Sequence, residues 1–355
     1  MNSRLNGLDL LRSVIMIFGP TFHASMLYSG AWGFDYQLQR NESVVDLLNL
    51  THPFRMGLFF IISGFFSALI ITKKGPQHFV ESRKKKLIKP TLLAGLITLP
   101  LIALEMYFLF EDTDLSDYLS YKHLWFLVVL CQLSLLLMSS PARITRGISG
   151  LAQHLNRWSW IGIFALFAAV NCACVVISKV ASNTLPSLIL DLTELINLIQ
   201  YTPYFFTGMI LYFLNKDISA RSALALSAIY FIWYLCSVIF EGQMKLALSL
   251  SRVVAVLAMC LAIFYTFKNL KIKDSPAISA LSKLALPFYL THLPILIFLG
   301  WVWSESALSK DPVLFLTYAV LLNIVLSFLL SMLIKKATPC HACWDWPSRK
   351  PYRGY

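Results

Sequence analysis

The sequence predicts an all-α, polytopic membrane protein with about ten transmembrane helices and both termini in the cytoplasm. Three observations lead to this fold class: long apolar stretches, few charged residues, and basic residues confined to alternate loops. The chain of 355 residues is 57% hydrophobic and only 14% charged, whereas a soluble domain carries about 25% charged residues. This composition excludes a disordered chain and disfavours a water-soluble fold.

The apolar stretches have the length of membrane-spanning helices. A hydrocarbon core about 30 Å thick needs about 20 mostly apolar residues per helix. The expected spans are 10–29, 53–72, 91–109, 124–139, 159–179, 195–214, 222–240, 247–267, 285–303 and 313–334. We therefore expect one membrane domain over residues 1–338, followed by a short basic cytoplasmic tail over residues 339–355.

The distribution of basic residues predicts the orientation of the spans. Lysines and arginines concentrate in every second connecting segment, for example in 73–89 and 143–157, and again in the tail. Cytoplasmic loops carry such an excess of basic residues. The net charge of +12 is therefore explained by topology and by anionic lipid, and we do not expect a nucleic-acid partner.

The first expected span carries two ionisable residues, Arg12 and His23. Eleven residues at about 100° each end about 20° past three full turns, so both side chains lie on one helix face, about 16 Å apart along the axis. Arg12 lies near the cytoplasmic end and could bind an anion. His23 could act as a general base on a hydroxyl. A histidine that only hydrogen-bonds a neighbouring helix is the alternative.

The second expected span carries Arg55 at its outer end and contains the pair Ser63-Gly64. Arg55 could hold a carbonyl or a carboxylate, or its side chain could extend to the interface. Two small residues permit close approach of a ligand or of another helix. Glu105, in the third span, could pair with Arg55.

A dense basic cluster precedes the third span. Its members include Arg83, Lys84, Lys85 and Lys89. The cluster could bind the phosphates of a nucleotide-containing donor, or it could only face lipid headgroups as a topology signal.

Two further histidines lie in or beside expected spans. His123 and Trp125 mark the start of the fourth span, where Trp125 fits the aromatic belt. His292 lies in the ninth span between two prolines, and it could be structural or catalytic. We expect no metal site, because the pair Cys340 and Cys343 supplies only half of a four-ligand zinc site.

These motifs, in this order, resemble the acyltransferase 3 family of membrane O-acyltransferases. The resemblance covers residues 4 to about 300, and the segments that carry it are Asp9-Leu10-Leu11-Arg12 with His23, Phe59-Phe60-Ile61-Ile62-Ser63-Gly64-Phe65, the basic stretch to Lys89-Pro90, His123-Leu124-Trp125-Phe126-Leu127 and Tyr289-Leu290-Thr291-His292. Within the family, His52-Pro53-Phe54-Arg55-Met56 and Gly19-Pro20-Thr21-Phe22-His23 look most like the branch of glucans biosynthesis protein C, the succinyltransferase of periplasmic glucans.

The resemblance implies an enzyme of the bacterial inner membrane that moves an acyl group from cytoplasmic acyl-CoA to a hydroxyl of a periplasmic or surface glycan. Succinyl-CoA is the donor of the most similar branch, and no bound cofactor is implied. His23 would be the general base and Arg12 a residue on the donor side. Arg55, Ser63 and Gly64 would line the acyl pocket, and Arg55 could pair with a succinyl carboxylate. Asp9, His123, Trp125 and His292 would support the site.

One departure from the family pattern concerns the basic cluster, which is rich in lysine where the family often has arginine. Lysine lacks the fork of arginine, so the resemblance does not extend to bidentate phosphate contacts at these lysines. Two alternatives stay open at this point. One is an O-acetyltransferase of another surface polysaccharide, and the other is a transporter or flippase for a glycan or lipid.

Overall fold

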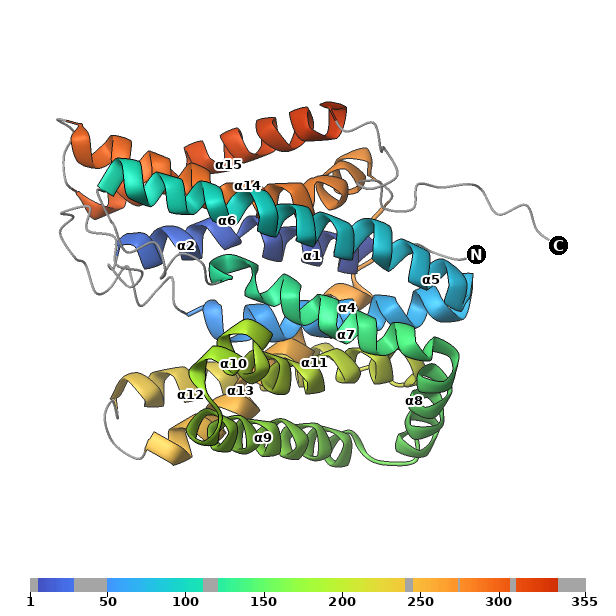
Figure 1. Ribbon diagram of the computed structural model, residues 1–355. Coiled ribbons are helices and arrows are strands. Elements are labelled where there is room, and N and C mark those ends of the chain that lie inside the picture. Colours follow the sequence, from blue (N-terminus) through green and yellow to red (C-terminus); the bar gives the residue numbers. More distant parts are fainter. Residues whose placement is uncertain are drawn as a thin grey trace. The chain divides into compact units, whose positions relative to one another are not determined.

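The computed structural model describes residues 6–28, 50–110, 121–239, 245–273, 275–306 and 311–337 (Figure 1). Over these residues the chain is helical and contains no strand, as predicted. All ten expected spans coincide with helices, which are α1 (Asn6–Ile17) with α2 (Gly19–Tyr28), α4 (His52–Lys74), α6 (Lys89–Phe110), α7 (Trp125–Ser139), α9 (Trp160–Thr184), α11 (Leu195–Phe213), α12 (Ala220–Ile239), α13 (Lys245–Asn269), α14 (Pro276–Glu305) and α15 (Pro312–Ala337).

Shorter helices connect some of these elements. They are α5 (Pro76–Arg83), the π-helical turn η1 (Lys84–Ile88), the 3-10 turn η3 (Lys122–Leu124), α8 (Pro141–Leu155) and α10 (Ser187–Thr193). α5, η1 and α6 follow one another without a break and form one long helix over Pro76–Leu109, which contains an apolar stretch long enough to cross a membrane.

Seven helices in the described part of the chain are long and apolar enough to cross a membrane, or eight if α7 and α8 form one bent span. The expected count of ten is therefore not confirmed. α7 has only 15 residues and meets α8 at 95°. α11 is long enough, with 19 residues, but it is too polar to be one of the seven. The cytoplasmic location of the termini remains a prediction.

The first expected span is divided near its middle. α1 ends at Ile17 and α2 begins at Gly19, with a turn at Phe18 between them. Pro20 has no N–H to donate to the preceding turn, which explains a local break. Backbone hydrogen bonds from Phe18 to Val14 and from Phe22 to Phe18 continue across it. The chain therefore stays helical from Arg12 to His23, apart from the turn at Phe18.

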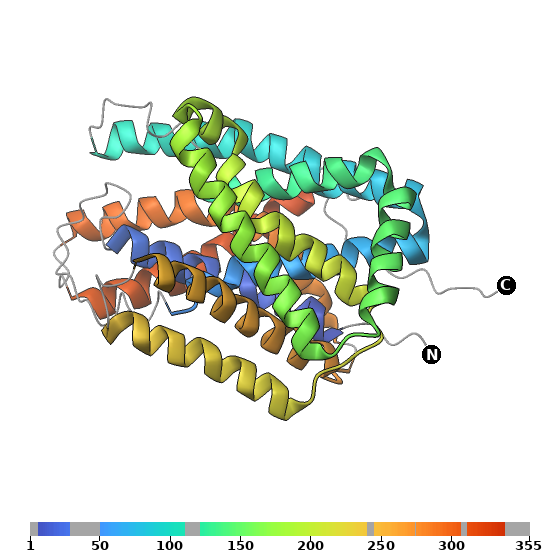
Figure 2. The same cartoon turned by 90° about the horizontal axis from the view of Figure 1, so that it is seen from below.

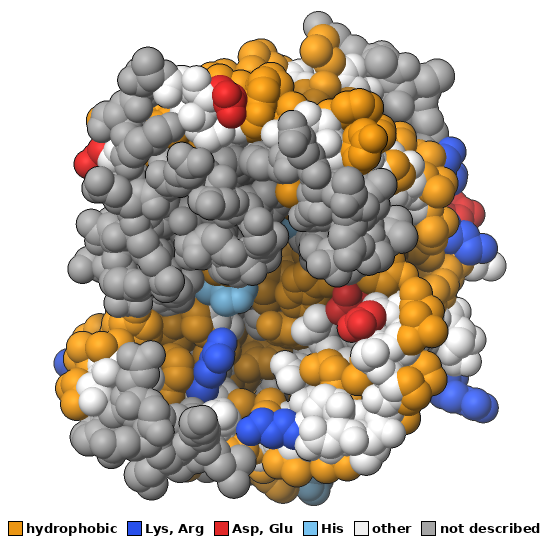
Figure 3. Space-filling model, turned by 60° about the vertical axis from the view of Figure 1, so that its left-hand side comes forward, with side chains coloured by type: hydrophobic (Ala, Val, Ile, Leu, Met, Phe, Trp, Pro, Cys, Tyr) orange, Lys and Arg blue, Asp and Glu red, His pale blue; other side chains and the backbone are white. Residues whose placement is uncertain are grey.

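Apolar side chains cover much of the protein surface, as expected for a chain that faces lipid. On the face in Figure 3, hydrophobic side chains predominate among the described residues and charged ones are few. Large exposed apolar residues are frequent on α6, α9, α12 and α15. A soluble monomer rarely exposes apolar patches of this extent.

The described helices fall into two compact units. The first unit contains α4, α7 to α13, and α5 as far as Glu81. The second unit contains α1 from Asp9 onward, α2, η1, α6, α14 and α15. Each unit is described below by itself.

Glycines allow α4 and α11 to pack closely in the first unit. A Cβ atom on Gly64 would lie 1.8 Å from the backbone oxygen of Phe205, and one on Gly208 would lie 1.9 Å from that of Ile61. Neither position has room for a side chain. α12 and α13 also pack side by side in this unit (Figure 2).

In the second unit, α14 packs against α2, α6 and α15. α14 contains Pro294, which has no N–H for the carbonyl of Leu290 four residues earlier. The hydroxyl of Thr98 on α6 donates to this carbonyl at 3.5 Å. Thr98 on a neighbouring helix thus gives the carbonyl of Leu290 the hydrogen-bond donor that Pro294 cannot supply, as membrane helices that contain proline require.

Candidate active site

Two histidines meet in the buried part of the second unit. His23 on α2 and His292 on α14 are 269 residues apart in the chain, yet Nδ1 of His23 lies 2.6 Å from Nε2 of His292. The two rings are nearly parallel, at 14°, with centroids 4.8 Å apart. His23 is 7% exposed and His292 is fully buried. The structure therefore brings together two histidines that were predicted as site residues from separate parts of the sequence.

A backbone carbonyl orients this pair. Nδ1 of His292 lies 2.6 Å from the oxygen of Tyr289. A carbonyl only accepts hydrogen bonds, so Nδ1 of His292 carries the proton. In neutral His292, Nε2 is then the acceptor, and Nδ1 of His23 donates to it. By this assignment, which follows from the hydrogen-bond pattern, the lone pair of neutral His23 is on Nε2.

Asn323 on α15 fixes the backbone of His292. Its Nδ2 donates to the carbonyl oxygen of His292 at 2.6 Å, and the asparagine is fully buried. Aromatic rings enclose the imidazole: Phe288 stacks at 6.3 Å and Tyr289 lies at 5.2 Å. Asn323 was not among the site residues predicted from the sequence. A lone asparagine within an apolar span was the available signal, but its partner could not be predicted.

Arg12 is held at the other end of the same helical segment. Its guanidinium lies 3.6 Å from a carboxylate oxygen of Asp9 and donates a hydrogen bond to Ser282 on α14. Asp9 and Arg12 are both buried. Asp9 thus balances the arginine charge, because a buried charge is costly without a partner.

The basic cluster coincides with a π-helical turn. Lys84 and Lys85 lie in η1, and the backbone N–H of Lys89 bonds to the carbonyl of Lys84, five residues earlier. Pro90 cannot donate to the carbonyl four residues before it, which explains why the regular pattern is interrupted here. The side chains of Lys84, Lys85 and Lys89 are exposed, while Arg83 is buried. Three lysines are thus accessible to an anionic ligand.

The other predicted site residues belong to the first unit. Arg55 and Ser63 lie buried on α4, where the carbonyl of Ser63 accepts a hydrogen bond from Ser67 at 2.7 Å. Gly64 faces the α11 backbone, which favours the packing interpretation of the small pair. A role of these three residues in acyl binding remains a prediction.

His123 and Trp125 flank the start of α7, also in the first unit. His123 is 2% exposed. Trp125 lies 5.2 Å from the ring of Tyr201 on α11, so it packs within the protein, and its place in an aromatic belt remains a prediction.

Two expectations from the sequence concern other polar groups. Glu105, which could pair with Arg55, is half-buried on α6 in the second unit, and its Oε2 accepts no hydrogen bond. Among the described residues, no group of three or more histidine, cysteine or acidic side chains is placed to hold a metal ion. Cys340 and Cys343 lie outside the described residues.

Comparison with known proteins identifies the family. A family model described as "Acyltransferase domain" matches residues 5–332. A relative from Escherichia coli O157:H7, named glucans biosynthesis protein C, is 24% identical over 317 residues, which cover 82% of each chain. The protein of the same name from Escherichia coli K12 is 24% identical over 322 residues, again 82% of each chain. No solved structure is significantly similar to the chain.

The family match spans nearly the whole chain and includes all the residues of the histidine pair, the Arg12 contacts and the basic cluster. The apolar helices agree with a multi-pass membrane protein. The chain therefore belongs to the acyltransferase family, as a membrane O-acyltransferase.

Proposed function

We propose that this protein transfers an acyl group from cytoplasmic acyl-CoA to a hydroxyl of a periplasmic or surface glycan, with His23 as the general base. The observation that carries the proposal is the buried pair of His23 and His292, in which Nδ1 of His23 is engaged at 2.6 Å. The pairing leaves Nε2 of neutral His23 as the basic nitrogen, which is the state that a general base needs.

The reaction needs no covalent enzyme intermediate. Nε2 of His23 takes the proton of the acceptor hydroxyl while the hydroxyl oxygen attacks the thioester carbonyl carbon. When the carbon–sulfur bond breaks, the His23 imidazolium returns the proton to the departing CoA sulfur. The products are a glycan ester and free CoA, and the enzyme regains its starting protonation.

His292 assists as a positioning residue. As His23 gains a proton on Nε2, its Nδ1–H continues to donate to the neutral Nε2 of His292. The carbonyl of Tyr289 holds His292 in the tautomer that accepts. A charge-assisted hydrogen bond is stronger than a neutral one, so the pair stabilises the imidazolium that forms during attack.

Residues of the same unit supply the groups for donor binding. Arg12 lies on the helical segment that leads to His23, and the exposed lysines of η1 and Lys89 offer positive charge to the phosphates of CoA. The separation of about 16 Å between Arg12 and His23 is of the order that a pantetheine arm spans. The proposal places the basic cluster in the cytoplasm and the protein in the inner membrane, as positive-inside topology predicts.

The acyl group and the acceptor are proposed from the relatives. The matched proteins are named glucans biosynthesis protein C, which supports a glycan acceptor. A succinyl group is the donor moiety that the sequence resemblance implies, and Arg55 is the residue that we expect to pair with its free carboxylate.

The test compares glycans from cells that lack the protein with glycans from cells that express the wild type or His23→Ala. Mass spectrometry of periplasmic and surface glycans should show one acyl ester lost in the deletion strain and restored by the wild type only. Membrane levels of the variant are measured in parallel. Restoration of the ester by His23→Ala at normal levels would refute the role of His23 as base.

A further inference from the structure

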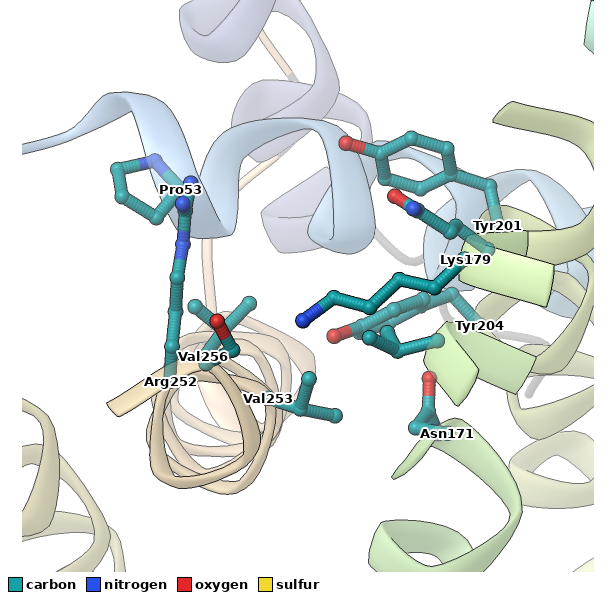
Figure 4. Close-up of a pocket in the computed structure, with 11 residues that line it drawn as sticks. Pro53, Asn171, Lys179, Tyr201, Tyr204, Arg252, Val253 and Val256 are labelled. Atoms are coloured by element: carbon teal, nitrogen blue, oxygen red, sulfur yellow. The ribbon is translucent and has the colours of Figure 1, made fainter. Parts of the chain in front are cut away.

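The first unit contains a cavity of about 220 Å³, lined by α4, α9, α11 and α13 (Figure 4). None of the residues predicted from the sequence for acyl transfer lines it. Its polar lining includes Asn171, Lys179, Gln200, Tyr201, Tyr204 and Arg252.

Two cations dominate the cavity. The Lys179 amine and the Tyr201 and Tyr204 hydroxyls point into the space that faces Arg252 (Figure 4). No acidic residue is among the side chains that line the cavity, and neither cation pairs with a carboxylate of the described chain. Lys179 and Arg252 lie on α9 and α13, two of the helices that are long and apolar enough to span the membrane. Both side chains are exposed, so the cavity is open and a ligand can reach its two cations.

Further positive charge lies near Tyr201, which lines the cavity. Arg55 and Arg252 are both close enough to Tyr201 to interact with it electrostatically. Lysine and arginine side chains near helix ends often extend to the interface. Lys179 and Arg252 lie near the ends of their helices, and the amine of Lys179 points into the cavity (Figure 4). An anion in the cavity would therefore be attracted by several cations at once.

The cavity also offers a hydrogen-bond acceptor. Asn171 is 2% exposed, and its Nδ2 donates to the carbonyl of Phe167 at 2.7 Å. This bond fixes Oδ1 as an acceptor, and Oδ1 is buried without a hydrogen-bond donor. A buried acceptor of this kind is costly unless something donates to it. A ligand with a hydroxyl group would satisfy Asn171, while an anionic group on the same ligand would satisfy the cations.

We propose that this cavity binds one sugar or polyol unit that carries an oxyanion, either a phosphate or a carboxylate. A volume of about 220 Å³ is below the roughly 300–1,000 Å³ of sites for drug-sized ligands, which fits a single unit. A soluble glycan fragment and the headgroup of a glycerol phospholipid share this chemistry. The inference does not depend on the acyl-transfer proposal, because the residues that its test changes have no role in that proposal and the test measures binding.

The test uses full-length protein in phosphatidylcholine nanodiscs. Isothermal titration calorimetry measures binding of glycerol 3-phosphate and of glucuronate, with glycerol as the uncharged comparison. We expect saturable binding of at least one anionic probe, weakened at least about tenfold by the double variant Lys179→Gln with Arg252→Gln, because charged hydrogen bonds are lost. A control double variant, Arg221→Gln with Lys271→Gln, removes the same charge from the first unit at residues that do not line the cavity, and it should bind as the wild type does.

A second arm distinguishes the two sources of the ligand. Native mass spectrometry of protein extracted from vesicles with phosphatidylglycerol should show retained anionic lipid if a headgroup is the occupant, and the Lys179/Arg252 double variant should lose it. Asn171→Leu should weaken binding of glycerol 3-phosphate while leaving binding of methyl phosphate unchanged. The proposal is overturned if neither the soluble probes nor the anionic lipid bind, or if both double variants bind equally.

Discussion

At the scale of single residues, the account depends on how His292 holds His23. The 2.6 Å contact between Nδ1 and Nε2 together with the carbonyl of Tyr289 determines which nitrogen of His23 carries the lone pair. A base with its lone pair on the wrong nitrogen cannot receive the proton of the acceptor without first turning its ring. Positioning by His292 is therefore as important to the proposed chemistry as His23 itself.

This positioning role predicts a difference between two substitutions of His292. The amide oxygen of His292→Gln can reach the place of Nε2 and accept from His23, whereas His292→Leu offers no acceptor. We expect kcat to fall about 10²-fold in His292→Leu and far less in His292→Gln, with the KM for acyl-CoA unchanged in both. Steady-state kinetics of the purified variants would measure this. Equal losses of kcat in the two variants would show that His292 is only a packing residue.

The sequence could predict part of this site. The spacing of Arg12 and His23 places them on one helix face, and the structure keeps them on one helical segment despite the turn at Phe18. Spacing cannot reveal contacts across the 269 residues that separate His23 from His292, nor the bond from Asn323. Such pairings depend on how distant helices pack, which local periodicity does not record.

At the scale of helices, the contact of α4 with α11 predicts a sharp intolerance of side chains. A Cβ at Gly64 would approach the oxygen of Phe205 to 1.8 Å, whereas one at Gly150 on α8 would meet nothing within 4 Å. We expect Gly64→Ala to lower the thermal stability of the detergent-solubilised protein, because overpacking costs about 1–3 kcal/mol. Gly150→Ala is the control, and it should be neutral or stabilising because alanine favours helix. Equal melting temperatures for the two variants would contradict the close packing.

The exposed lysines of η1 give a prediction for donor binding. Reversal of charge in Lys84→Glu with Lys85→Glu should raise the KM for acyl-CoA roughly fivefold to tenfold, because attraction to the phosphates becomes repulsion. The control is Arg143→Glu with Arg146→Glu on α8, where both arginines are exposed. Kinetics at low and high salt would check this, since screening should reduce the difference. An unchanged KM would leave these lysines as topology signals only.

Helix positions were more predictable than the number of spans. Apolar stretches located every main helix, because burial in lipid or in protein requires the same residues. The count differed for three reasons: the first span is divided into α1 and α2, α11 is partly polar, and the short α7 meets α8 at 95°. Hydrophobicity alone does not distinguish a span from a bent or partly polar helix.

At the scale of the whole molecule, the distribution of basic residues predicts that both termini lie in the cytoplasm. A fluorescent protein that folds only in the cytoplasm should fluoresce when fused to either terminus. A periplasmic reporter, alkaline phosphatase, should be active when fused at residue 310 and inactive after the tail. Opposite locations for the two termini would require an odd number of spans and would reject the predicted topology.

The central claim is that a buried histidine promotes acyl transfer from acyl-CoA to a glycan hydroxyl. Its most direct measurement uses the purified protein in sealed vesicles, with acyl-CoA supplied on the side of the basic cluster and glycan on the other. The account predicts that CoA release and glycan ester appear in equal amounts, and that His23→Gln slows both by roughly 10²–10⁴-fold. Glycan transport without CoA release, or an undiminished rate in His23→Gln, would contradict it.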